Sequence, residues 1–282
     1  FLLERFMLLK KNKVKMINVD TRNFSDLSQV FEEYKPTKVI HLSAISSAIK
    51  ARDNPSLCFD IQLISLKNLL ELSRQKKKLI NQFVFLSSST VYGDFEQIEV
   101  DENTRPRPRG IYANTKYMGE RLVRTYCHQY GLGTTIIRPS ALYGERCISK
   151  RVSQVFVENA LEKKISKLEG GGKGMLDFTY IDDLVQGIIR SLVYHKGHNT
   201  SQTFNITFGR ARTIKELFDI VKHYIPNSKS VNAARVLEKP IRGTLSIKRA
   251  NKILKFKPTW PLEKGYANYI EWFKAMWERN IK

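Results

Sequence analysis

The sequence predicts an α/β protein built on a doubly wound parallel sheet, with a smaller mixed α/β lobe towards the C-terminus. Three largely apolar runs, 39–44, 83–86 and 134–138, lack the alternation of a half-exposed strand and therefore indicate buried parallel strands. The segments between them carry apolar residues every three to four positions, as in helices that cover a sheet. A chain of 282 residues can hold one large domain, or a domain with a smaller lobe.

Composition and cysteine spacing argue against several classes of protein. The chain is 42% hydrophobic and 11% aromatic, which is ordinary for a globular domain. No apolar run approaches the roughly 18 residues of a membrane span, and the first residues do not form a secretion signal. Cys58, Cys127 and Cys147 show neither close pairing nor metal-ligand spacing. We therefore expect structural thiols, no metal site and a cytoplasmic location.

The formal net charge of +21 fits an anionic ligand, a membrane surface or nucleic acid. Lysine pairs and runs are scattered between the predicted elements, and aromatic residues do not interleave with them as stacking platforms would. The charge is therefore interpreted as a lysine-rich background, with neither a membrane nor nucleic acid favoured as a partner. A non-catalytic protein that binds RNA or a protein partner through this surface stays an alternative.

The N-terminal part predicts a helix over 1–11 that leads into a strand over 14–19. A second helix is expected over 25–34, with Ser25 or Asp26 as its cap. The later elements follow from the same patterns: a long helix over 56–74, further helices over 152–164, 184–192 and 263–277, a strand at 204–207 and a capping box at 213–216.

The residues that suggest chemistry surround the second apolar run. Ser88 stands where that strand leaves the sheet, and chemistry gathers at the carboxyl edge of such sheets. Tyr112 and Lys116 open a helix and share one of its faces, because they are four residues apart. A tyrosine titrates near pH 10, and we expect the ammonium of Lys116 to lower the pKa of Tyr112 so that it can act as a base. Ser88 could hydrogen-bond the same substrate oxygen.

Asp182 and Asp183 precede a predicted helix, and two aspartates alone are a poor metal signature. They are interpreted as caps of that helix. The stripe Tyr266, Ile270, Phe273 and Trp277 is interpreted as core or as an oligomer contact.

Ser88 lies three residues before Val91-Tyr92-Gly93, and Tyr112-x-x-x-Lys116 follows about twenty residues later. This arrangement resembles the extended short-chain dehydrogenase/reductase family, the NAD-dependent sugar-nucleotide epimerases and dehydratases, and in particular the UDP-glucose 4-epimerase-like members. Segments similar to other family motifs occur in the same order along essentially the whole chain: His41–Ala44, Arg138–Gly144, Leu176–Leu184 and Lys239–Thr244.

The resemblance implies a Rossmann-like NAD-binding domain over 1–145 and a mainly substrate-binding lobe over 146–282, with some segments returning to the sheet. In the family, a strand, a Gly-x-x-Gly-x-x-Gly turn, a helix and a second strand come before the first segment seen here. The sequence contains no such turn, and the cluster Gly170–Gly174 is interpreted as an ordinary turn. We therefore expect an N-terminally truncated fragment that lacks the first βαβ unit and is inactive alone; the other explanation is a family member that has lost its cofactor.

The resemblance also implies the site. Ser88, Tyr112 and Lys116 would be catalytic, and Arg242 would reach the nucleotide diphosphate, since a guanidinium fits phosphate oxygens. The family arginine and asparagine for the substrate are replaced by Leu176 and Ala141. Cofactor contacts are expected from Asp20, Thr21, Leu42, Ser43, Ala44, Ser87, Tyr112, Lys116, Pro139 and Ser140, and substrate contacts from Ser46, Thr90 and Arg242.

The implied function is NAD-dependent epimerisation of a nucleoside-diphosphate sugar through a transient keto intermediate, with NADP left open and a homodimer expected. Tyr112 would remove a hydroxyl proton while NAD accepts hydride from the same carbon. A dehydratase is less favoured, because Ser89 and Thr90 follow Ser88 where related dehydratases place an Asp-Glu pair. A reductase or a decarboxylase stays open.

Overall fold

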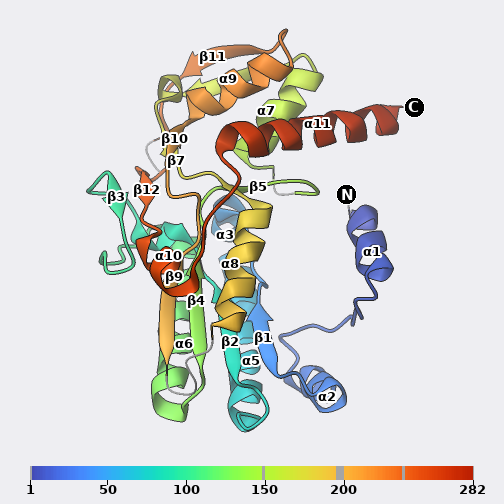
Figure 1. Cartoon of the computed structure of the whole chain (residues 1–282), viewed down its shortest axis with the longest axis vertical. Coiled ribbons are helices and arrows are strands. Elements are labelled where there is room, and N and C mark those ends of the chain that lie inside the picture. Colours follow the sequence, from blue (N-terminus) through green and yellow to red (C-terminus); the bar gives the residue numbers. More distant parts are fainter. Residues whose placement is uncertain (1, 148–149, 195–199, 237–238, 282) are drawn as a thin grey trace.

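The computed structural model describes residues 2–147, 150–194, 200–236 and 239–281. A parallel sheet with its helices forms one half of the molecule, and a lobe around the C-terminal helix forms the other (Figure 1). The helices are α1 (Leu2–Lys11), α2 (Phe24–Tyr34), α3 (Ala48–Asp53), α4 (Pro55–Phe59), α5 (Ser65–Gln75), α6 (Gly110–Tyr130), α7 (Val152–Leu161), α8 (Ile181–Val193), α9 (Ile214–Tyr224), α10 (Lys248–Leu254) and α11 (Leu262–Ile281), with the π-helix η1 (Asp60–Ile64) and the 3-10 turns η2 (Ser89–Tyr92) and η3 (Gly170–Gly172).

The main sheet has four parallel strands in the order β1-β2-β4-β9. Its central strands are the apolar runs at 83–86 and 134–138, so the prediction of buried parallel strands is confirmed for these two. The run at 39–44 forms a parallel strand at the edge of the sheet that ends at His41, and its residues alternate between exposed and buried, because an edge strand is covered less completely. The strands are β1 (Lys38–His41), β2 (Gln82–Leu86), β3 (Glu99–Val100), β4 (Thr134–Arg138), β5 (Leu142–Tyr143), β6 (Ile165–Glu169), β7 (Met175–Leu176), β8 (Thr179–Tyr180), β9 (Ser201–Asn205), β10 (Arg212–Thr213), β11 (Lys229–Ala233) and β12 (Thr244–Leu245).

Helices cover both faces of the sheet, which makes the fold doubly wound. One core joins α2, α5 and α6 to the sheet through residues such as Leu70 and Phe85. A second core joins α8 and α10 to the opposite face through Leu184 and Phe204. Gly119 lets α6 approach the sheet closely, because a Cβ there would lie 2.6 Å from Cζ of Phe85.

The lobe has its own core, built by α7, α9 and α11. Tyr266, Ile270 and Phe273 of α11 are buried in it, so the core interpretation of that stripe is confirmed. The chain returns from the lobe to the sheet at α8 and β9. The division at residue 146 stays a prediction.

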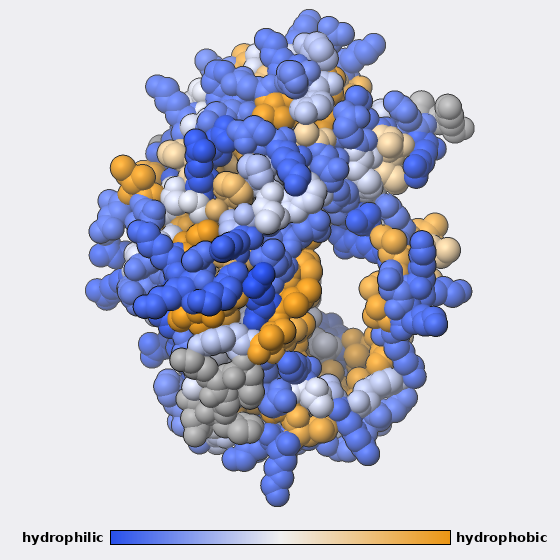
Figure 2. All heavy atoms as spheres, viewed as in Figure 1, coloured by the Kyte–Doolittle hydropathy of each residue, from blue (hydrophilic) through white to orange (hydrophobic). Residues whose placement is uncertain are grey.

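The strand predicted in the N-terminal arm, residues 2–22, is absent. Residues 14–19 form no strand: they pair with no neighbour, and a strand needs one to satisfy its backbone groups. None of the residues of α1 is buried, and its described polar contacts with the body are both with Arg146: an ion pair with Glu4 at 3.3 Å, and a hydrogen bond that the guanidinium of Arg5 donates to the carbonyl oxygen. Figure 2 shows an opening between this arm and the body, with apolar atoms along its border.

Three helix predictions also need correction. The helix over 56–74 is interrupted by the π-helix η1. Asn23, and not Ser25 or Asp26, caps α2, because its side chain accepts a hydrogen bond from the amide of Asp26. Asp182 and Asp183 make no capping bond to α8. Instead, Asp183 accepts hydrogen bonds from the amides of Thr259 and Trp260, which fixes the approach to α11.

Other predictions hold. The capping box of Thr213 and Glu216 is present, and Gly170–Gly172 form a tight turn. The strand predicted at 204–207 is present as β9 but is displaced, since it begins at Ser201 and ends at Asn205. Of the helices described, none is long and apolar enough to cross a membrane.

Candidate active site

Ser88 sits at the carboxyl end of β2, where the chain turns from the sheet into η2. Its Oγ accepts hydrogen bonds from the amide of Thr90 at 3.2 Å and from the hydroxyl of Thr90 at 3.0 Å. The side chain therefore caps the short helix and is held in one place. Ser88 is 9% exposed, so the hydroxyl lies at the base of the edge and not on the outer surface.

Helix α6 brings Tyr112 and Lys116 to the same edge. The hydroxyl of Tyr112 lies close enough to Ser88 for this serine to favour the phenolate form. The ammonium of Lys116 donates to the carbonyl oxygen of Leu86 at 2.7 Å and lies 5.2 Å from the ring centre of Phe85. The three side chains that sequence spacing selected therefore converge at the end of β2.

The predicted direction of the Tyr112 pKa is wrong. Burial raises the pKa of Tyr112, and the charge of Arg151 and the hydroxyl of Ser88 oppose this only in part. Lys116 is turned towards the carbonyl of Leu86, and burial lowers its own pKa to about 8. At neutral pH the site therefore holds a phenol and an ammonium.

His41 of β1 lies beneath this site. Its ring stacks on Phe85 at 5.7 Å between centroids, and neither ring nitrogen has a partner within the described chain. Burial, with the charge of Lys116, lowers the pKa of His41 to about 3. The imidazole is neutral and packed, which agrees with a structural role.

Sequence reasoning missed Glu120, one turn beyond Lys116 on α6. Its carboxylate is fully buried and accepts two hydrogen bonds from Arg138, at 2.8 and 2.6 Å. The hydroxyl of Ser87 donates to the same carboxylate at 2.7 Å. The available signal was the four-residue spacing from Lys116, which places an acid on the buried face of the helix.

The residues expected near the cofactor line the carboxyl edge of β1, β2 and β4. Leu42 is 56% exposed directly after β1, and the small residues Ser43 and Ala44 follow it partly buried. Pro139 and Ser140 continue β4 and are buried. Small side chains and an exposed apolar one suit the close approach of a planar ring.

Asp20 and Thr21 are held in the loop before α2. The carboxylate of Asp20 is bound by the guanidinium of Arg22, and hydrogen bonds from Arg22 lower its pKa to about 2. Thr21 donates to the hydroxyl of Ser65 at 2.8 Å, and Asn68 donates to its carbonyl oxygen. The described contacts of both side chains are thus within the protein, and a cofactor role for either stays a prediction.

The edge fits the nicotinamide end of NAD. An ammonium has three protons to donate, and the one hydrogen bond of Lys116 that the structure describes uses only one. The others could reach ribose hydroxyls. The hydroxyl of Ser87, in contrast, is committed to Glu120, so a contact from Ser87 would have to come from its backbone.

The predicted substrate residues lie on three loops. Ser46 is exposed before α3. Thr90 is turned towards Ser88. Arg242, from the loop before β12, donates to the hydroxyl of Ser89 and stacks on Phe95 at 5.0 Å. Burial lowers the pKa of Arg242 to about 10, and no carboxylate of the described chain forms an ion pair with it.

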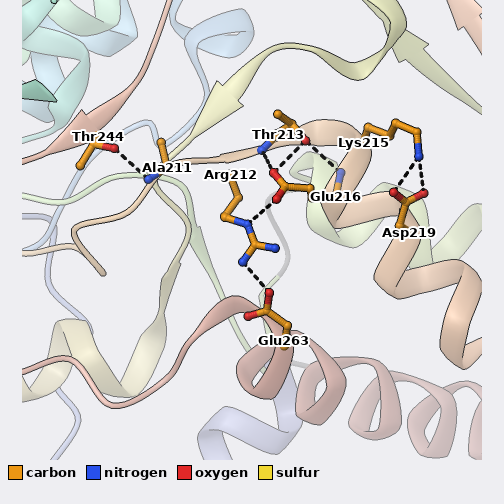
Figure 3. A network of polar contacts seen from close by, with 8 residues as sticks. All are labelled: Ala211, Arg212, Thr213, Lys215, Glu216, Asp219, Thr244 and Glu263. Atoms are coloured by element: carbon orange, nitrogen blue, oxygen red, sulfur yellow. Dashed lines mark hydrogen bonds and ion pairs between the residues drawn. The ribbon is translucent and has the colours of Figure 1, made fainter. Parts of the chain in front are cut away.

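Leu176, which stands in place of the family arginine, pairs with Arg212 across β7 and β10. Figure 3 shows that the guanidinium of Arg212 lies between Glu216 and Glu263. Its charge is neutralised within the lobe, so Arg212 does not replace the missing arginine as a phosphate ligand. Over the described ranges, no group of three or more potential ligands is arranged to hold a metal ion.

Comparison with known proteins gives a consistent result. The model of the "NAD dependent epimerase/dehydratase family" matches residues 4–207. The chain is 31% identical to the "Putative UDP-glucose 4-epimerase" of Methanocaldococcus jannaschii, over 93% of this chain and 85% of that protein. It is 29% identical to the UDP-glucuronate 4-epimerase of Thermodesulfobacterium geofontis, over 95% of this chain and 81% of that protein.

Among solved structures, the UDP-glucose 4-epimerase of Thermotoga maritima with UDP-glucose superposes with a TM-score of 0.86 at 25% identity. The match covers 93% of this chain and 84% of that one. The family match, the parallel sheet and the convergence of Ser88, Tyr112 and Lys116 agree. The chain belongs to the NAD dependent epimerase/dehydratase family and is an enzyme of that family.

Proposed function

We propose that the protein uses NAD to invert C4 of a UDP-sugar, with UDP-glucose and UDP-glucuronate as the first candidates. The observation that carries the proposal is the meeting of Ser88, Tyr112 and Lys116 at the carboxyl end of β2. The choice of C4 and of UDP-sugars is supported by the relatives, which are named as UDP-glucose and UDP-glucuronate 4-epimerases.

NAD held at this edge by Lys116 would supply the acceptor and donor of hydride for the sugar carbon. Tyr112 takes the proton of the sugar hydroxyl and gives it back, and Ser88 holds the same oxygen. Lys116 binds the ribose and presents its positive charge to the phenol as the proton leaves. Burial raises the pKa of Tyr112, and the described charge that opposes this rise is that of Arg151, so loss of the proton depends on Arg151.

The structure favours epimerisation over dehydration. A dehydratase needs a free acid beside the catalytic hydroxyl to handle the neighbouring proton and the water. Asp94 accepts a hydrogen bond from the amide of Ile241 at 2.7 Å and pairs with Arg109. Glu96 pairs with Arg107. Asp94 and Glu96, the first two acids after Ser88 in the sequence, are therefore engaged away from it.

Arg242 is proposed to bind the diphosphate. Its contact with Ser89 places a guanidinium one residue from the proposed catalytic serine; Asp177 and Asp94 act on it through space, and no described acid forms an ion pair with it. Replacement by glutamine should raise KM for the UDP-sugar about tenfold or more, because a charge-assisted contact is lost, while kcat changes less. An unchanged KM would exclude Arg242 as a substrate ligand.

A homodimer also stays a proposal. The elements α4, η1 and α6 contact one another, and each carries an exposed apolar side chain: Leu57, Ile64 and Met118 are 42%, 43% and 47% exposed. Sedimentation of the protein at several concentrations distinguishes a dimer from a monomer.

The test of the function is the conversion of UDP-glucose and UDP-glucuronate to their C4 epimers, followed by NMR, with protein expressed from its intact gene. Tyr112→Phe should reduce kcat about 10³-fold, as expected for loss of general acid–base catalysis. Tyr126→Phe is the matched control, because Tyr126 lies on the same helix and contacts Glu71 outside the site. No turnover of either sugar by the unaltered protein would refute the proposal.

A further inference from the structure

The buried pair of Glu120 and Arg138 is costly for the protein to keep. Glu120 is 0% exposed and Arg138 is 2% exposed. Removing two charges from water costs free energy that their attraction often fails to recover, so well-packed apolar residues can replace such a pair without loss of stability. A gain in stability therefore does not explain why this pair is present.

The position of Glu120 and Arg138 in the fold offers an explanation for the pair. Glu120 lies one turn after Lys116 and two turns after Tyr112 on α6. Ser87, which donates to Glu120, directly precedes Ser88. Arg138 is the last residue of β4, next to Pro139. One carboxylate thus ties the helix of the proposed base to the two strand ends that complete the site.

The carboxylate also acts on Lys116 through space. The groups that face Lys116 are the carbonyl oxygen of Leu86 on β2, His41 on β1, Cys58 on α4 and Glu120 on α6. His41 is neutral. Burial alone raises the pKa of Glu120, but the hydrogen bonds and charge of Arg138 outweigh it, so that the pKa is lowered and Glu120 is ionised at neutral pH. Burial disfavours the ammonium form of Lys116, and Cys58 and then the charge of Glu120 favour it.

We propose that Glu120 is a positioning residue of this site: its carboxylate fixes Ser88 relative to Tyr112 and keeps Lys116 charged inside the protein. The inference rests on the proposed function for its catalytic meaning. The contact network and the charge state can be tested without turnover.

The test is a double-mutant cycle between Glu120 and Lys116, read as the free energy of unfolding from pH 7 to pH 10. The variants are Glu120→Gln, which keeps the size of the side chain, Lys116→Met, and the two combined. Burying the charged Lys116 lowers the free energy of unfolding at pH values below its pKa in the folded protein, about 8. This cost disappears as the pH rises towards the pKa of Lys116 in the unfolded chain. Glu120→Gln should therefore destabilise more at pH 7 than at pH 10, and this pH dependence should disappear in the Lys116→Met background.

Equal destabilisation at both pH values in both backgrounds would overturn the proposal and leave Glu120 as a structural clamp. If Glu120→Gln does not fold, Arg124→Met replaces it. Arg124 donates to Glu120 at 3.1 Å and is partly exposed, and its loss leaves the carboxylate less compensated. Arg124→Met should then have the opposite effect to Glu120→Gln: its free energy of unfolding should rise less between pH 7 and pH 10 than that of the unaltered protein. The same rise in both proteins would count against the proposal.

Kinetic measurements are a second test of the role of Glu120. If the unaltered protein turns over a UDP-sugar, Glu120→Gln should lower kcat at pH 7 about twofold or more and change KM less than kcat. A fall of about one unit in the Lys116 pKa, from about 8, would take the ammonium fraction at pH 7 from about nine-tenths to about one half. Ser87→Ala, which removes the tether but not the charge, should keep the unaltered pH dependence of stability. Absence of turnover in the unaltered protein would refute the proposed function, while the stability cycle would still decide the role of Glu120.

Discussion

Lys116→Met should make the protein more stable and inactive. Methionine has a similar length and carries no charge, so it removes the cost of burying an ammonium. Burial lowers the pKa of Lys116 from 10.5 to about 8, and each unit corresponds to about 1.4 kcal/mol, so the cost at pH 7 is about 3 kcal/mol. The variant also leaves the carbonyl of Leu86 without its donor, at about 1 kcal/mol.

The net gain expected for Lys116→Met is therefore about 2 kcal/mol. With an unfolding entropy of about 2.1 cal/mol/K per residue, this is a rise in Tm of about 3 °C. The sign of the pH dependence follows from the lowered pKa: the cost is complete below about pH 8 and disappears as the pH approaches 10.5. The advantage of the variant should shrink accordingly between pH 7 and pH 10.5.

Urea unfolding of Lys116→Met followed by circular dichroism at several pH values measures this difference. Lys222→Met, on the exposed face of α9, is the matched control and should change stability by less than about 0.5 kcal/mol. A variant that is destabilised at pH 7, or an advantage that grows with pH, would refute the reasoning.

Three further predictions concern the fold, and urea unfolding measures each of them. Gly119→Ala should cost about 1–3 kcal/mol, because its Cβ would lie 2.6 Å from Cζ of Phe85; Gly174→Ala, whose Cβ would meet only ordinary contacts, should be nearly neutral, and equal effects would contradict the close approach of α6. Asp183→Ala should cost about 2 kcal/mol by leaving the amides of Thr259 and Trp260 without acceptors, and no effect would show that α11 is fixed by packing alone. Thr213→Ala should cost about 1 kcal/mol through loss of the capping box, and a change below about 0.3 kcal/mol would argue against that cap.

Patterns among residues close in the sequence were enough to predict the central part of this protein. The apolar runs of β2 and β4 and the four-residue spacing of Tyr112 and Lys116 depend on neighbours in sequence, so the sheet edge and its three polar side chains could be predicted. The comparison with known families confirmed the class of enzyme that those residues indicate.

Features that depend on distant partners could not be read in the same way. Residues 14–19 have the composition of a strand but no strand beside them. The pKa of Tyr112 depends on burial, which sums contributions from elements far apart in the chain. Glu120 gains its importance from Ser87 and Arg138, which lie 33 and 18 residues away.

The central claim is that this site inverts a sugar carbon through oxidation and return of the same hydride. The most direct measurement is turnover of a UDP-sugar in deuterium oxide with protein expressed from its intact gene, with the C4 position of the product examined by NMR and mass spectrometry. The account predicts that the epimer forms with hydrogen, and no deuterium, on C4, and that Tyr112→Phe abolishes its formation. Incorporation of deuterium at C4 would show inversion by proton exchange with solvent and would contradict the account.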